Sequence, residues 1–217
     1  MKLAIIDYGM GNLRSVYNAL IALGAAPSIA ETPEQLEDAD KIILPGVGAF
    51  GDGMMNLRAR GFEPALNRLV IEERRPFLGI CLGMQMLVTT GFEHGEHRGL
   101  GWIEGKSVRI EPRENLRVPH IGWNGTHRLK ETELLHDCPE GTAFYFVHSY
   151  HVVPDERGVV TSVAEYGGEI VATVQKDNIY GAQFHPEKSH KYGLQLLRNF
   201  MERVESAAEV PAYSRPA

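Results

Sequence analysis

A nine-residue segment constrains the fold of this chain more than any other feature. Residues 77–85 (FLGICLGMQ) place an apolar strand directly before Gly-x-Cys-x-Gly and a helical stretch. Gly79 and Gly83 allow the tight strand-to-helix turn of a nucleophile elbow, which projects Cys81 and aims helix N-terminal N–H groups at its substrate. Because such N–H groups favour thiolate, the segment predicts a nucleophilic Cys81. A small core cysteine is the alternative that this segment leaves open.

Strand and helix patterns alternate through the first part of the chain. Apolar runs typical of buried strands are separated by segments with helical spacing or helix-capping residues. Strands are expected at residues 2–8, 41–44 and 76–80, and helices at 11–23, 32–35 and 64–73. This alternation predicts an α/β fold with a mostly parallel central sheet flanked by helices. In such folds, functional residues lie beyond the carboxyl ends of the strands.

The C-terminal half changes character from about residue 100 onward, where short β-rich runs predict an additional antiparallel or mixed portion. The runs cover residues 142–150, 159–165, 170–176 and 179–185, and a closing amphipathic helix is expected over 191–204. We expect a single domain over residues 1–205, because one core supports a chain of this length. Residues 206–217 are expected to form a frayed tail.

The charge and the cysteine count narrow the partners and the compartment. A net charge of −6 and a pI near 5.9 give no electrostatic footprint for nucleic acid, so small molecules or proteins are the expected partners. The N-terminal apolar run is too short for a signal-peptide core or a membrane span. Two cysteines make no disulfide framework, and Cys138 is expected to be structural. The sequence therefore predicts a cytoplasmic protein that makes no use of a membrane.

His185 and Glu187 supply the base that a catalytic cysteine needs. They stand two residues apart after an apolar run, and side chains two apart on an extended segment point the same way. Glu187 can then orient His185 and stabilise its charged form, which completes a Cys-His-Glu triad with Cys81. His148 and His151 form a second pair without a carboxylate nearby in the sequence, and we expect their segment to line the pocket.

A glycine-rich strip allows two interpretations. Residues 46–51 (GVGAFG) satisfy Gly-x-Gly-x-x-Gly, and Glu72 and Glu73 follow roughly twenty residues later, as in a dinucleotide-binding unit. Residues 52–54 do not resemble the helix start that such a unit requires. The alternative is an oxyanion strand, whose backbone N–H groups stabilise a tetrahedral intermediate beside the elbow. The presence of the elbow favours the oxyanion strand.

His94 and His97 come nearest to a metal-binding pattern. They lie three residues apart in HGEH, without Cys partners, an HExxH pattern or a third ligand. We therefore expect a solvated loop at this position, and neither a metal nor a cofactor.

The strip, the elbow and the His-Pro-Glu segment together resemble the motifs of the triad-type glutamine amidotransferases over essentially the whole chain. Residues 7–13 (DYGMGNL), 51–54 (GDGM) and 120–124 (HIGWN) narrow the match, because they look like those of the glutaminase subunits of imidazole glycerol phosphate synthase. The resemblance implies hydrolysis of glutamine to glutamate and ammonia. It also implies a heterodimer with a (β/α)8-barrel cyclase subunit, which uses the ammonia in histidine biosynthesis.

The same resemblance assigns roles to individual residues. It makes Cys81 the nucleophile, His185 the base and Glu187 its orienter. The oxyanion is assigned to the backbone around Gly46, Val47 and Leu82. The glutamine contacts are assigned to Gly48, Gln85, His148, Ser149 and Tyr150. The partner interface or ammonia passage is assigned to Asn12, Trp123, Asn124, Tyr145 and Lys188. By chemistry alone, Asn12 fits a helix cap, Trp123 a core aromatic and Lys188 a solvated charge about equally well.

Other functions stay open on the sequence alone. The same triad would serve a glutaminase of pyridoxal phosphate, nucleotide or anthranilate synthesis, or a stand-alone cysteine peptidase or hydrolase. A silent regulatory subunit would keep the fold, although the intact triad argues against it. Because a glutaminase that worked without its partner would waste glutamine, we expect the strip at residues 45–48 to switch its N–H groups with the state of the partner.

Overall fold

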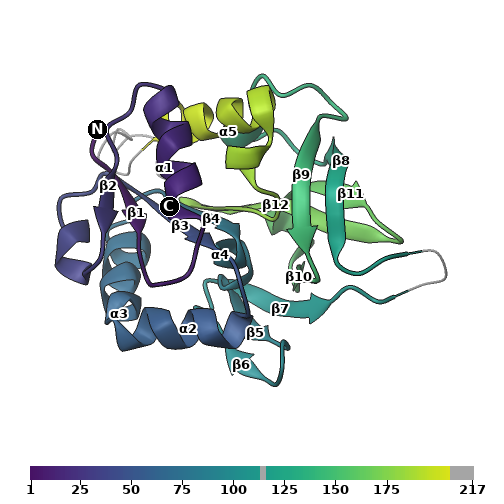
Figure 1. Cartoon of the computed structure of the whole chain (residues 1–217), viewed down its shortest axis with the longest axis horizontal. Coiled ribbons are helices and arrows are strands. Elements are labelled where there is room, and N and C mark those ends of the chain that lie inside the picture. The colour runs from purple at the N-terminus through teal and green to yellow at the C-terminus, as the bar shows by residue number, and fades with distance from the viewer. Residues whose placement is uncertain (113–115, 206–217) are drawn as a thin grey trace, which may run out of the picture.

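The computed structural model describes residues 1–112 and 116–205, and a nine-stranded sheet forms its centre (Figure 1). The strand order is β2-β1-β3-β4-β13-β12-β11-β8-β9. The first five strands are parallel: β2 (Ser28–Ala30), β1 (Leu3–Ile6), β3 (Lys41–Gly46), β4 (Phe77–Cys81) and β13 (Ile179–Ala182). The others pair antiparallel: β12 (Glu169–Lys176), β11 (Val160–Glu165), β8 (His120–Arg128) and β9 (Ala143–His148). The predicted fold class is confirmed, whereas the tail predicted at 206–217 lies outside the described residues.

Helices cover both faces of the parallel part, because its strands are apolar on both sides. In β1, Ala4 and Ile6 pack into one core, while Leu3 and Ile5 pack into the other. Figure 1 shows two pairs of helices on opposite sides of the sheet. The first core lies under α2 (Phe50–Ala59) and α3 (Phe62–Leu66), and the second under α1 (Leu13–Ala22) and α5 (His190–Glu202).

The shorter helical segments follow local sequence chemistry. The capping box predicted at residues 32–35 is present before the 3₁₀ turn Pro33–Leu36, where the backbone N–H of Thr32 donates to Gln35 Oε1 at 3.2 Å. The helix predicted at 64–73 begins earlier, with α3, and continues as a π-helical segment, Asn67–Glu72. Further 3₁₀ turns are Glu133–Leu135, Arg157–Val159 and Pro186–Lys188. No helix within 1–112 and 116–205 is long and apolar enough to cross a membrane.

A second, four-stranded sheet was not predicted from the sequence. Its order is β10-β7-β5-β6, with β10 (Tyr150–Pro154), β7 (Ile103–Arg109), β5 (Val88–Gly91) and β6 (His97–Arg98). The run predicted as one strand at 142–150 splits at Ser149, because β9 joins the large sheet and β10 joins the small one. Ser149 accepts a hydrogen bond from Ile110 N–H at 2.8 Å at this crossing. The crossing carries the backbone of residues 147–150 past the end of β4, where Cys81 lies.

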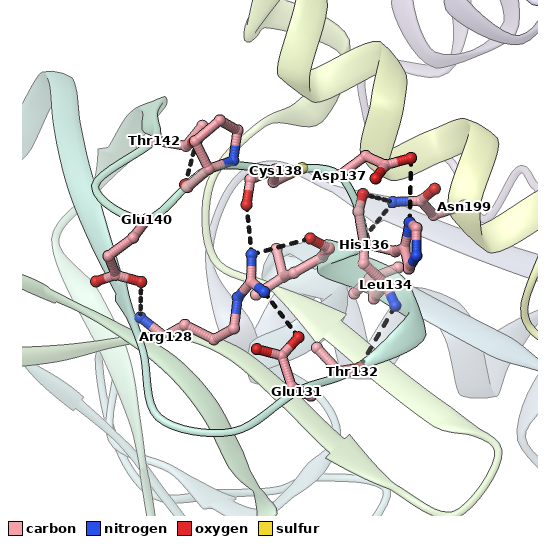
Figure 2. Close-up of polar contacts among 12 residues, drawn as sticks. Arg128, Glu131, Thr132, Leu134, His136, Asp137, Cys138, Glu140, Thr142 and Asn199 are labelled. Atoms are coloured by element: carbon pink, nitrogen blue, oxygen red, sulfur yellow. Dashed lines mark hydrogen bonds and ion pairs between the residues drawn. The ribbon is translucent and has the colours of Figure 1, made fainter.

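The connection between β8 and β9 is held by Arg128, as Figure 2 shows. The guanidinium donates to the carbonyl oxygens of Leu135, at 3.2 Å, and Cys138, and pairs with Glu131 at 2.8 Å. The Asn199 amide of α5 donates to the carbonyl of His136 at 2.6 Å. These donors satisfy carbonyls that would otherwise lack a hydrogen-bond partner. They fix the β8–β9 connection in place and tie it to α5.

Candidate active site

Cys81 ends strand β4 and stands directly before helix α4 (Leu82–Gln85). Its φ of 54° puts a non-glycine residue in the left-handed region, a strain of about 1–3 kcal/mol that the surrounding packing must hold. A Cβ added to Gly83 would lie 1.9 Å from the carbonyl oxygen of Leu44, and one added to Gly79 would lie 2.5 Å from that of Gly83. The two glycines are therefore required by close packing, and Cys81 lies in the tight turn expected of an elbow.

His185 and Glu187 are in direct contact, but not by the route expected. Nδ1 of His185 lies 2.8 Å from Oε1 of Glu187, and the side chains are 2% and 1% exposed. The extended segment predicted to reach residue 185 ends at Ala182, and Glu187 lies in the 3₁₀ turn Pro186–Lys188. The turn folds the carboxylate back onto the ring, so turn geometry rather than strand alternation makes the pair.

The imidazole of His185 has a raised pKa. Burial by itself lowers this pKa, but the interactions with Cys81 and Glu187 outweigh burial and raise it from 6.5 to about 9. His185 is therefore protonated at neutral pH, with its charge beside the sulfur of Cys81. Its buried Nε2 has no hydrogen-bond partner of ordinary geometry in the part of the chain that the structure describes. That atom is available for proton transfer.

A cavity of about 600 Å³ contains the cysteine, the imidazole and most of the residues assigned to glutamine. It is large enough for one amino acid, and its charged side chains are few. Its lining includes Val47, Gly48, Cys81, Leu82, Gln85, Glu93, His94, Pro119, His148, Ser149, Tyr150, His185 and Lys188. The structure therefore brings together residues that lie more than a hundred positions apart in the sequence.

The oxyanion strip lies beside the elbow, where it was predicted. Gly46 pairs with Cys81 in the β3–β4 register, and a Cβ added to Gly46 would lie 2.8 Å from Leu82 Cβ. Val47 is 40% exposed and Gly48 has a φ of +103°, a conformation that favours glycine. The backbone of the strip thus closely approaches the start of α4, where N–H groups are without intrahelical partners.

The structure corrects the argument that no helix begins after this glycine-rich strip. Helix α2 does begin at Phe50, although no helix start was expected there, because Gly53 allows it to pack closely on α4: an added Cβ would lie 3.1 Å from Leu82. Tertiary packing overrides the weak helix propensity of this segment. A different observation argues against nucleotide binding. The Glu93 carboxylate accepts the Phe50 N–H at 2.8 Å and so occupies the helix N-terminus that a pyrophosphate would need.

Glu93 is a pocket residue that the sequence analysis missed. Among the described lining residues it is the only carboxylate. It lies in the loop between β5 and β6, in the small sheet that was not predicted. No local spacing marks it, because the long-range pairing of β5 with β7 determines where this loop lies.

A buried chain of hydrogen bonds lies along one wall of the cavity. Gln85 donates from Nε2 to the carbonyl of Tyr150 at 2.8 Å. His148 places Nδ1 2.8 Å from the same carbonyl and Nε2 3.0 Å from Nδ1 of His120. Burial lowers the pKa of His148 to about 3 and that of His120 to about 4. Both rings are neutral at physiological pH, so neither competes with His185 as the charged partner of the thiol, and His151 does not line the cavity.

Three of the residues assigned to the partner interface lie on strands β8 and β9, and only Lys188 lines the cavity. Trp123 is 49% exposed, which rules out a core aromatic, and it stacks on His190 with ring centroids 5.0 Å apart. Tyr145 pairs with Trp123 across β8 and β9. Asn124 donates to the carbonyl of Glu165 at 2.9 Å. Lys188 lines the cavity, whereas Asn12 precedes α1 and accepts the Ser15 hydroxyl at 2.8 Å.

The histidines near residue 95 are not in a simple solvated loop. His94 lines the cavity and His97 belongs to strand β6, packed against Gly51. Within residues 1–112 and 116–205, no three or more His, Cys, Asp or Glu side chains are grouped to hold a metal ion.

A strained cysteine and a buried imidazole–carboxylate pair lie in one pocket at the carboxyl ends of parallel strands. This arrangement is typical of a cysteine-dependent enzyme that acts on a small carbonyl substrate. The profile of "Glutamine amidotransferase class-I" matches residues 4–204. The chain is 46% identical to "Imidazole glycerol phosphate synthase subunit HisH 2" of Pseudomonas aeruginosa, over 93% of this chain and 100% of that protein. It is 47% identical to the HisH subunit of Aquifex aeolicus, over 94% of this chain and 98% of that protein.

Solved structures agree on the fold. "Structure of PurLQS from Thermotoga maritima" gives a TM-score of 0.73 at 19% identity, covering 94% of this chain and 99% of that chain. A "Crystal structure of glutamine amidotransferase" gives a TM-score of 0.71 at 21% identity, covering 92% of this chain and 97% of that chain. This chain belongs to the class-I glutamine amidotransferase family and, within it, to the HisH branch.

Proposed function

We propose that this chain is the glutaminase subunit of imidazole glycerol phosphate synthase in histidine biosynthesis. It hydrolyses glutamine to glutamate and ammonia, and a (β/α)8-barrel cyclase subunit bound as a heterodimer uses the ammonia. The observation that carries the chemistry is the strained Cys81 in one cavity with the buried His185–Glu187 pair. The HisH relatives support the choice of synthase. The cytoplasm, where thiols stay reduced, is the compartment that fits.

The triad carries the reaction in two steps with the protons balanced. The Cys81 thiolate attacks the side-chain carbonyl carbon of glutamine, and protonated His185 gives its proton to the nitrogen. The C–N bond breaks, ammonia leaves, and a γ-glutamyl thioester remains on Cys81. Neutral His185 then accepts a proton from water as the water oxygen attacks the thioester. The C–S bond breaks, the γ-carboxylic acid leaves and loses its proton to solvent as glutamate, and the thiolate–imidazolium pair returns, with Glu187 holding the ring in both steps.

The cavity has partners for each end of glutamine. During the reaction the side-chain carbonyl oxygen of glutamine develops negative charge. We assign the N–H groups of Leu82 and of the strip that holds Val47 to this oxygen. The ammonium group requires an anion, and Glu93 is the only carboxylate among the described lining residues. Ser149 and Tyr150 line the same cavity, and we assign their backbone N–H groups to the α-carboxylate. Glu93→Gln should therefore raise the KM for glutamine by about tenfold with a smaller effect on kcat, since a charge-assisted hydrogen bond is lost. An unchanged KM would contradict this assignment.

The synthase assignment is tested by reconstitution. The chain is mixed with a barrel cyclase and its ribulosyl nucleotide, glutamine is added, and glutamate and the imidazole product are both measured. We expect the two products to form in equal amounts. A complex with Cys81→Ala should make no glutamate, yet still form the imidazole product when ammonium salt is supplied. Glutamate release without the imidazole product, or coupling to another synthase instead, would overturn the assignment.

A further inference from the structure

Gln183 is a buried residue of the site that the triad mechanism leaves without a role. It follows β13 two residues before His185, and its side chain is 0% exposed. Its carboxamide bridges two parts of the site: Nε2 lies 3.7 Å from Cys81 Sγ, and Oε1 lies 3.2 Å from Nε2 of Gln85. A buried amide in this position is held in place by specific partners.

The direction of these hydrogen bonds is fixed by the surrounding network. An amide nitrogen and oxygen are interchangeable in shape, so their assignment must come from the partners. The Gln85 atom that faces Gln183 also lies 2.8 Å from the carbonyl oxygen of Tyr150, which only accepts, so that atom is the Gln85 nitrogen. The Gln183 atom facing it is therefore the oxygen. It follows that the Gln183 NH2 group is the one directed at the sulfur of Cys81.

An N–H donor beside Sγ favours the thiolate over the thiol, because a hydrogen bond to a charged acceptor is stronger than one to a neutral acceptor. Being neutral and unable to titrate, the amide does this without competing with His185 for the proton. It also fixes the direction of the sulfur above the strained elbow. Through Gln85, the same amide is linked to the backbone of Tyr150, which lines the glutamine pocket.

We propose that Gln183 is a further catalytic residue of this site, which donates a hydrogen bond to the Cys81 thiolate and holds it in the attacking position. The proposal deepens the proposed function, since it concerns the nucleophile of the glutaminase reaction. The thiolate then has two stabilising neighbours of different kinds. His185 supplies charge and protons, and Gln183 supplies a fixed neutral donor whose orientation depends on Gln85.

Two variants separate donation from shape. Gln183→Met keeps the length of the side chain and removes the donor, while Gln183→Glu keeps the shape and, when its carboxyl group is ionised, replaces the donor with an acceptor. Gln175→Met is the matched control, because the part-buried Gln175 also bridges two groups, Thr132 and Tyr180, but does so away from the cavity.

The first readout is the rate at which iodoacetamide alkylates Cys81, measured across pH on the full chain and located by mass spectrometry. The titratable groups that interact with this sulfur are His185 and Tyr8. His148 lines the same cavity. Neither variant removes any of these groups, and Gln183→Glu adds one carboxyl group beside the sulfur. We expect alkylation at pH 7 to slow by about tenfold or more in Gln183→Met, with the profile moved to higher pH, and further in Gln183→Glu. Gln175→Met should match the wild type.

The second readout is glutamine hydrolysis by the complex with the cyclase. We expect kcat to fall by about tenfold or more in Gln183→Met while KM changes by less than about threefold, because the lost contact is to the nucleophile. Wild-type alkylation across pH in both variants would overturn the proposal, as would a loss confined to KM. If Gln183→Met does not fold, Gln183→Glu, which preserves the shape, decides the question. Alkylation needs no glutamine, so a failure of the glutaminase assignment would leave this readout intact.

Discussion

The two cysteines of this chain lie in regions that are both buried but chemically opposite. Cys81 and Cys138 are 6% and 4% exposed. Cys138 sits in the β8–β9 connection, where burial raises its pKa to about 11 even though the nearby Arg128 opposes the shift. Cys81 stands on a strained turn in a cavity with a protonated imidazole. Burial alone thus keeps a thiol protonated and inert, and reactivity comes from the turn that presents it to a charged partner.

The largest expected difference between the two regions is in glutamine hydrolysis. Cys81→Ala should abolish turnover, by more than about ten-thousandfold, because no other group forms the thioester. Cys138→Ala should keep the wild-type kcat and cost about 1 kcal/mol in the free energy of unfolding, as a small core deletion does. Steady-state glutamate release and denaturant unfolding check both. A comparable loss of kcat in Cys138→Ala would break the comparison.

A second test examines what activates the sulfur. His185→Asn should lower kcat by about a hundred- to ten-thousandfold, since both proton transfers are lost. Glu187→Gln should cost less, because the carboxylate orients the ring and contributes to its raised pKa without moving a proton. The claim is this order of damage, measured as kcat at one pH with saturating glutamine. Near wild-type turnover in either variant would exclude that residue from the triad.

A third test concerns the strip at residues 45–48, which lies beside the elbow and has no counterpart at Cys138. The chain alone should release glutamate slowly, and the partner with its nucleotide ligand should accelerate it by at least about a hundredfold, the usual effect of one oxyanion donor. Gly48→Ala should reduce this acceleration, because φ is +103° there and an added Cβ would lie 2.7 Å from Met10 Cε.

The matched control for the strip is Gly101→Ala. Gly101 also has a positive φ, of +70°, but nothing lies within 4 Å of an added Cβ, so it carries a similar backbone strain away from the strip. Its activation should equal that of the wild type. Full activity of the isolated chain, unchanged by partner and ligand, would show a fixed oxyanion hole instead of a switch.

The smallest effect on kcat is expected in the β8–β9 connection around Arg128. Arg128→Met removes the donors to the carbonyls of Leu135 and Cys138, and should cost about 1–3 kcal/mol in the free energy of unfolding. The kcat of the folded variant should stay within about twofold of the wild type, because residues far from the site rarely affect catalysis. A large loss of kcat without a loss of stability would mean that this region is coupled to the pocket.

The features that the sequence predicted correctly are those that depend on neighbouring residues in the chain. The elbow was found because Gly79, Cys81 and Gly83 are adjacent in the chain and each is needed for a local steric reason. The alternating strands and helices likewise follow from local periodicity, and the fold class was confirmed. His185 and Glu187 were paired correctly although the assumed extended geometry was wrong, because a turn also brings residues two apart together.

The residues that were missed depend on contacts far along the chain. Glu93 reaches the cavity through the pairing of β5 with β7. His120 lies in a motif that was noted in the sequence, but its contact with His148 depends on the pairing of β8 with β9 and could not be predicted. In the small sheet, β5 and β6 are short, and the buried positions of β7 alternate but hold Ile103, Gly105 and Ser107, so no apolar period of two marks these strands in the sequence. The start of α2 was missed because close packing on α4, and not helix propensity, stabilises it.

The central claim is that one of two buried thiols is the nucleophile for glutamine. It is tested most directly by incubating the chain, in complex with the cyclase, with an electrophilic glutamine analogue and mapping the modified residue by mass spectrometry across pH. Because the pKa of His185 is raised to about 9, Cys81 should be labelled through the neutral range. Excess glutamine should protect it. Cys138 should stay unlabelled well below pH 11, the range in which its thiol is protonated. Labelling of Cys138 instead of Cys81, or labelling of Cys81 that glutamine does not slow, would contradict the account.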